Sequence, residues 1–184
     1  MKIILFVILV CFLSDLCSQN FYSEDWVYLK SDDIIHYTVN KTKKFRIKNL
    51  TIEIIWDEKM SKNKYLKDLG GIKSMKIYKD NQLTNTIQNI EDKIQLREIN
   101  FHFYDFNFDG NLDFTIPINS SWRKYYLYNP TNNTFQYYED WDYLKIQKIN
   151  KKNKQILSQP DGNIPNSREL FQINGNEIIK IKNI

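Results

Sequence analysis

Apolar and polar residues alternate along much of this chain with a period close to two. The alternation is clear over residues 34–39, 50–56 and 72–78, which are also rich in β-branched and aromatic side chains. Such segments form strands whose successive side chains point to opposite faces of a sheet. Short strands of this kind, separated by polar turns, predict an all-β fold.

Turn-forming clusters between pairs of these strands predict antiparallel hairpins. The Asn174-Gly175 pair is the strongest such signal, because both residues tolerate the positive φ of a tight turn. Residues 61–69, which precede two glycines, are the one segment expected to form a short helix. The fold we predict is a small antiparallel β-propeller-like meander of hairpins, with a β-sandwich as the alternative. The three hairpins join residues 72–78 to 86–90, 124–128 to 135–138, and 170–173 to 177–181.

The first 18 residues have the composition of a secretory signal peptide. One lysine precedes an apolar run that is too short to span a membrane comfortably, and a more polar stretch follows. Both cysteines, Cys11 and Cys17, lie in this segment, so the mature chain is expected to contain no disulfide. We therefore expect residues 19–184 to form a single exported domain, in the periplasm or outside the cell, without a membrane span.

The charge pattern argues against nucleic-acid binding. The formal net charge is only +4, and basic and acidic residues are interspersed. Lysines do cluster at residues 41–44 and 148–154, but no aromatic residues are interleaved to stack on bases. We interpret these two runs as solvated turns, and we expect the protein to be a monomer.

Residues 105–113, Asp-Phe-Asn-Phe-Asp-Gly-Asn-Leu-Asp, are the most informative stretch of the chain. Oxygen-bearing side chains recur at every second position before and after a glycine, which is how a loop wraps a calcium ion with six to eight oxygens. We predict a calcium site here. Its ligands would be the side chains of Asp105, Asn107, Asp109 and Asp113 and the backbone carbonyl of Asn111.

This loop differs from an EF-hand. The twelfth position from Asp105 is Ile116, where an EF-hand has a bidentate glutamate, and both flanks alternate as strands do. The loop is therefore expected to join two strands. The alternative is an Asx-rich turn without an ion, in which Gly110 takes a left-handed conformation.

Several segments together resemble a family of small exported bacterial propeller-like proteins. The resemblance spans residues 72 to 182, and its most specific parts are the 105–113 loop and the hairpin around Asn129-Pro130. Some members of that family are periplasmic immunity proteins that bind and block lysozyme-like effectors. The resemblance implies a propeller-like fold and a peptidoglycan hydrolase or other exported protein as partner. Asn111 departs from the pattern, since an aromatic residue often occupies this place.

We expect a binding protein rather than an enzyme. Aromatic residues in and near the hairpin after the loop are candidate partner contacts, with core packing as their alternative. A glycan-binding or adhesive module is the other binding hypothesis. The only histidines, His36 and His102, lie in strand-like runs, and no nucleophile elbow or zinc motif is present. The candidate partner contacts are Trp122, Tyr125, Tyr137 and Trp141.

Overall fold

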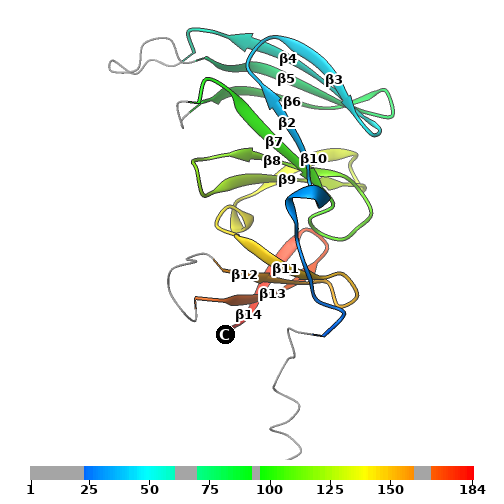
Figure 1. The fold of residues 1–184 in the computed structure, drawn as a ribbon. Coiled ribbons are helices and arrows are strands. Elements are labelled where there is room, and N and C mark those ends of the chain that lie inside the picture. The colour runs from blue at the N-terminus through cyan, green and yellow to red at the C-terminus, as the bar shows by residue number, and fades with distance from the viewer. Residues whose placement is uncertain (1–22, 61–69, 93–95, 160–166) are drawn as a thin grey trace, which may run out of the picture.

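A computed structural model describes residues 23–60, 70–92, 96–159 and 167–184 (Figure 1). The predicted signal peptide and the predicted helix at 61–69 lie outside these residues. Among the described residues, no helix is long and apolar enough to cross a membrane. The only helical elements described are two 3-10 turns, η1 (Ser31–Asp33) and η2 (Glu139–Trp141).

The described chain forms three antiparallel sheets stacked one on another (Figure 1). The N-terminal sheet has the order β3-β4-β5-β6, the central sheet β10-β9-β8-β7-β2, and the C-terminal sheet β1-β11-β12-β13-β14. The strands of the N-terminal sheet are β3 (Lys43–Ile47), β4 (Leu50–Asp57), β5 (Gly71–Lys79) and β6 (Gln82–Glu91). Those of the central sheet are β2 (Ile35–Val39), β7 (Ile99–Tyr104), β8 (Asp113–Pro117), β9 (Arg123–Asn129) and β10 (Thr134–Tyr138). Those of the C-terminal sheet are β1 (Val27–Tyr28), β11 (Ile146–Asn150), β12 (Gln155–Ser158), β13 (Glu169–Asn174) and β14 (Glu177–Asn183).

This architecture confirms the predicted all-β, antiparallel class. Each of the three predicted hairpins is present, as β5–β6, β9–β10 and β13–β14. The sheets are open rather than closed, and their face-to-face stacking is the layout of a sandwich.

The central sheet is covered on both faces, and this places two cores in the molecule. In β8, Phe114 and Ile116 pack toward the N-terminal sheet, together with Phe101 and Phe103 of β7. The opposite face packs against the C-terminal sheet, where Leu127 is fully buried. Because both faces of the sheet are covered, four successive residues of β8 are buried, and buried and exposed residues do not alternate along this strand.

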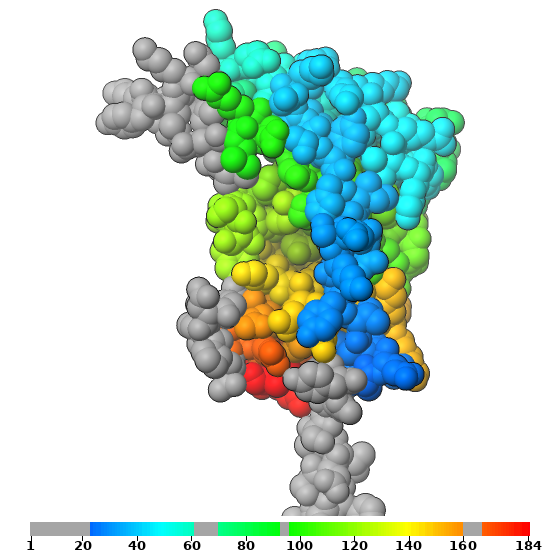
Figure 2. Space-filling view, in the orientation of Figure 1, coloured from blue at the N-terminus to red at the C-terminus, as the bar shows by residue number. Residues whose placement is uncertain are grey.

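The segment from β1 to β3 connects all three sheets. It supplies β1 at an edge of the C-terminal sheet, β2 at an edge of the central sheet and β3 at an edge of the N-terminal sheet. Figure 2 shows this blue segment running along one side of the molecule past all three layers. The stack is therefore tied together by continuous chain as well as by its cores.

The two lysine clusters are not both solvated turns, and that prediction is wrong in part. Lys43 and Lys44 begin edge strand β3, where their charged ends reach solvent. Lys148 is buried in β11, with its Nζ 4.5 Å from the centre of the Tyr28 ring. A ring that covers a lysine chain stabilises its charge through a cation–π contact. Residues 151–154 do form a turn.

Candidate functional site

The 105–113 loop connects β7 to β8, so it joins two paired strands as predicted. Gly110 has φ +86, the left-handed conformation expected at the turn. Phe108 also has a positive φ of 59, which is uncommon for a bulky residue. The loop therefore curls tightly back on itself.

Backbone N–H groups of the loop bond its own acidic side chains. The two carboxylate oxygens of Asp105 accept hydrogen bonds from the N–H groups of Asp109, at 2.9 Å, and Gly110, at 3.0 Å. Asp109 in turn accepts a bond of 2.7 Å from the N–H of Asn111. The Asp109 bond is an Asx turn, and the Asp105 bonds reach four and five residues further along the chain. Together they hold the two carboxylates against the loop backbone.

Asp113 lies at the base of the loop and is fully buried. Its carboxylate accepts hydrogen bonds from the N–H of Phe106, at 2.9 Å, and from the N–H of Tyr128 in β9, at 2.8 Å. Burial raises the pKa of Asp113 well above its usual value, and the nearby charges of Asp109 and Asp105 raise it further. Asp113 thus holds the loop to strand β9 of the central sheet through these two hydrogen bonds.

The two asparagines point to different neighbours. Asn107 donates a hydrogen bond of 2.5 Å from its Nδ2 to Asn176 in the turn between β13 and β14. Asn111 accepts a bond of 2.7 Å from the Nζ of Lys79, which also lies 3.3 Å from the centre of the Tyr128 ring. For Asn111, the backbone carbonyl is then the atom to consider as a ligand, as the sequence suggested.

The five predicted ligands do not form a ready-made cage. In the part of the chain that the structure describes, no three His, Cys, Asp or Glu side chains form a group that could hold a metal ion. Their chemistry nevertheless suits calcium, because ionised carboxylates that already accept N–H bonds keep further lone pairs. Burial and the charge of Asp109 both raise the pKa of Asp105. A bound cation would lower the pKa of Asp105 and so oppose the effect of the Asp109 charge.

Asn176 connects this loop to the rest of the molecule. Besides its bond with Asn107, its Nδ2 donates to the hydroxyl of Tyr138 at 3.0 Å, and its carbonyl accepts from the Trp141 indole at 3.0 Å. The loop, η2 and the β13–β14 hairpin therefore meet at one residue, through both the side chain and the backbone carbonyl of Asn176. Sequence reasoning missed this role, because the Asn-Gly signal indicates a turn but not what the turn contacts.

Two of the predicted partner contacts are core residues. Tyr125 and Trp141 are buried between the central and C-terminal sheets, so in this structure they offer no surface to a partner. Their core-packing alternative is what the structure shows. For Tyr125, the reason is that alternate residues of β9, Tyr125 and Leu127, face the second core.

The other two candidate contacts, Trp122 and Tyr137, lie near Tyr143, and we call these three residues the aromatic patch. Tyr137 and Tyr143 are exposed, and Trp122 is half-buried. The side chain of Tyr143 is 66% exposed and meets Trp122 edge-on, with the ring centres 5.6 Å apart. Tyr137 is 39% exposed and donates a hydrogen bond from its hydroxyl to Asp142. Lys124 lies over the Tyr137 ring, with its Nζ 4.7 Å from the ring centre.

The two histidines face each other across β2 and β7. The ring centres of His36 and His102 are 4.3 Å apart and the rings meet edge-on. Burial, with help from the charges of Arg123 and His36, lowers the pKa of His102 to about 3. His102 is therefore neutral over the physiological pH range.

Comparisons of the chain with protein families, with curated proteins and with solved structures found no match.

Proposed function

We propose that the protein is an exported, calcium-stabilised β scaffold that binds a partner protein and has no catalysis of its own. The observation that carries this proposal is the aromatic patch, in which Tyr137 and Tyr143 are exposed beside the half-buried Trp122. Tyrosine and tryptophan are the residues that most often anchor protein interfaces, because they combine a large apolar area with a polar group.

The patch rests on a rigid support. Tyr137 packs on Tyr126, with the ring centres 5.7 Å apart, and Tyr126 stacks on the buried Phe114 at 4.8 Å. The hydrogen bond to Asp142 fixes the far end of the Tyr137 ring. A surface held in this way loses little conformational entropy on binding, which favours affinity.

Calcium has a structural part in this proposal. Asp105, Asn107 and Asp109 would hold the ion, and the backbone carbonyl of Asn111 and the side chain of Asp113 are the remaining predicted ligands. The ion would neutralise the negative charge gathered in the loop. Because Asn107 also bonds Asn176, a loop made rigid in this way would hold the C-terminal hairpin in place. Exported modules meet calcium at millimolar concentrations and bind it with dissociation constants close to that level. A structural role for the ion therefore fits better than calcium sensing.

The partner class is a peptidoglycan-cleaving, lysozyme-like enzyme, as the family resemblance implies. The test measures inhibition of a broad panel of such hydrolases by the mature protein, with Trp122→Ala and Tyr143→Ala as patch variants. Tyr28→Ala is the matched control, because Tyr28 is also an exposed tyrosine but lies on the C-terminal sheet. We expect inhibition that weakens by about tenfold or more in the patch variants alone. Failure of the parent protein to bind any hydrolase of the panel would refute the proposal.

A glycan-binding module is the second candidate, favoured by the exposure of Tyr143 beside Trp122. Aromatic faces stack on sugar rings, so this pair of side chains could bind a glycan as well as a protein. Titration with soluble glycans and peptidoglycan fragments, in the absence of any enzyme, separates the two candidates. Binding of sugar that is lost in Tyr143→Ala would favour the glycan module.

A further inference from the structure

Strand β6 is an exposed edge of unusual length. It has ten residues, the most of any strand in the described chain, and it pairs only with β5 on one side. An edge strand presents backbone N–H and C=O groups that can pair with another extended chain. Such an edge is a template for strand addition unless the protein protects it.

The other edges are protected, and β6 is not. Edge strands β3 and β14 each carry two lysines, and β1, β2 and β10 have five residues or fewer. Charged side chains and short length are the usual means of preventing strand addition. The sequence of β6, Gln-Leu-Thr-Asn-Thr-Ile-Gln-Asn-Ile-Glu, contains no lysine, arginine or proline. Its single charge is at its last residue, Glu91.

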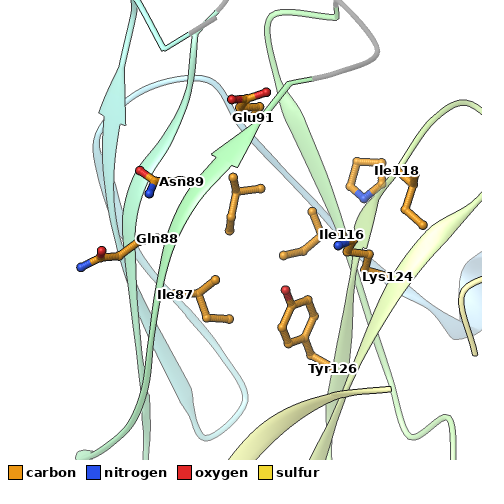
Figure 3. A pocket seen from close by; sticks show the side chains of 10 residues that line it. Ile87, Gln88, Asn89, Glu91, Ile116, Ile118, Lys124 and Tyr126 are labelled. Carbon is orange, nitrogen blue, oxygen red and sulfur yellow. The ribbon is translucent and has the colours of Figure 1, made fainter. Parts of the chain in front are cut away.

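A cavity lies directly beside this edge, between β6 and strands β8 and β9 (Figure 3). Ile87 and Ile90 line it from β6, and Ile116 and Tyr126 line it from the central sheet. Its volume is about 220 Å³. Pockets for drug-sized ligands begin at about 300 Å³, so this cavity better suits one apolar side chain than a whole small molecule.

The backbone of β6 is shaped to line this cavity. Strict alternation would place residues 87 and 90 on opposite faces, but Asn89 has φ 58 in the middle of the strand. Ile87 pairs with Met75 and Ile90 with Ile72, and both β5 partners are fully buried in the core. A left-handed residue away from any turn is a local strain that commonly accompanies a binding site.

The other end of β6 is fastened to the central sheet. The Asn85 side chain bonds both backbone groups of Phe135 in β10, donating to its carbonyl at 2.8 Å and accepting from its N–H at 2.6 Å. This contact satisfies the outer edge of β10 at that point. The opening between the two sheets is thus confined to the 87–91 end of β6.

The cavity also has a polar side. The Tyr126 hydroxyl points into it between Ile87 and Ile116 in Figure 3. Lys124 lines it as well and is exposed. Its Nζ lies over the Tyr137 ring but forms no ion pair with any carboxylate of the described residues. A negatively charged group of a ligand would complement this ammonium.

We propose that β6 accepts an extended segment of a partner polypeptide as an added strand along residues 86–91. One bulky apolar side chain of the segment occupies the cavity, and a neighbouring acidic side chain lies beside Lys124. Main-chain pairing supplies affinity in this mode, and the side-chain pocket supplies specificity. The inference rests on the proposed function, since it specifies how the protein partner is held.

The test uses the full mature protein and short linear peptides displayed on phage. Peptides selected on the parent are assayed for binding to Lys124→Glu and to a matched control, Lys73→Glu, an exposed lysine of β5 that does not line the cavity. We expect selected peptides with an apolar residue near an acidic one, and binding that weakens by about tenfold in Lys124→Glu but not in the control. Hydrogen exchange then follows the backbone amides of β6, and the bound peptide should slow exchange within residues 86–91.

The outcomes separate this inference from the proposed function. Selected peptides that protect β6, together with no binding to any hydrolase, would support strand addition and refute only the hydrolase partner. Hydrolase binding that leaves β6 exchange unchanged and is indifferent to Lys124→Glu would overturn strand addition while the proposed function stood. The inference is equally overturned if no peptide binds above background, or if the bound peptides leave the β6 amides unprotected.

Discussion

At the scale of single residues, Asp113 has the largest expected effect on stability. Its buried carboxylate is the acceptor for the N–H groups of both Phe106 and Tyr128. Asp113→Ala would leave two buried N–H groups without that acceptor, at a cost of about 1–3 kcal/mol each, so we expect the free energy of unfolding to fall by about 3 kcal/mol. Urea denaturation measures this free energy of unfolding. Asp113→Asn keeps one acceptor and should lose less, so equal losses in the two variants would contradict this account.

His102 should make stability depend on pH in the acid range. Its folded pKa of about 3 lies below the ordinary value of 6.5, because burial and Arg123 disfavour the charged ring. Protons therefore bind the unfolded state first, so the free energy of unfolding is highest above pH 6.5 and falls as the pH drops toward 3. The slope is below the limit of about 1.4 kcal/mol per pH unit, because the ring is only partly buried. Denaturation at several pH values should show this slope in the parent and a smaller one in His102→Gln; identical slopes would exclude His102 as the cause.

At this same scale, sequence spacing located the loop but not its contacts. Alternation at Asp105, Asn107 and Asp109 is a local pattern, so it can be read directly from the chain. The Asn107–Asn176 bond joins residues 69 positions apart, and only the stacking of the sheets brings them together. The sequence left Tyr125 open between a partner contact and core packing for a similar reason, because strand alternation does not indicate whether a second sheet covers the other face.

At the scale of elements, the β13–β14 hairpin should depend on Asn176. Its side chain bonds Asn107 at 2.5 Å and Tyr138 at 3.0 Å. Asn176→Ala removes both bonds, and we expect a loss of about 1–3 kcal/mol in the free energy of unfolding and faster amide exchange in the hairpin. Asn174→Ala, in the same turn but exposed, is the matched control. Similar exchange in both variants would indicate that the turn, rather than the Asn176 contacts, holds the hairpin.

Strands with a clear period of two were predicted well, both inside the sheets and at their edges. Strand β4 was expected at 50–56 and spans Leu50–Asp57, because its inward residues are consistently apolar. The solvated turn predicted at 41–44 overlaps the start of β3, because the lysines that protect a sheet edge resemble those of a solvated loop. Lys148 was misjudged because the ring that covers it, Tyr28, comes from a strand far away in the sequence.

At the scale of the whole molecule, the three sheets are expected to respond to calcium as one unit. The β1–β3 segment adds an edge strand to each sheet, and Asn176 links the 105–113 loop to the third sheet. An ion bound in the loop would therefore stabilise the stack rather than the loop alone. Local stabilisation would instead leave the global transition unchanged.

Thermal unfolding of the mature protein with calcium and with chelator tests this expectation. At ten times the dissociation constant, one bound ion adds about 1.4 kcal/mol, which raises the midpoint by about 3–6 °C for a domain of this size. Asp109→Ala should abolish the shift. Its carboxylate accepts only from within the loop, so the variant should keep its fold. Since a generic ionic effect would act on parent and variant alike, an equal shift in both would place calcium elsewhere. No shift in either would leave residues 105–113 as an Asx-rich turn, held by its own backbone.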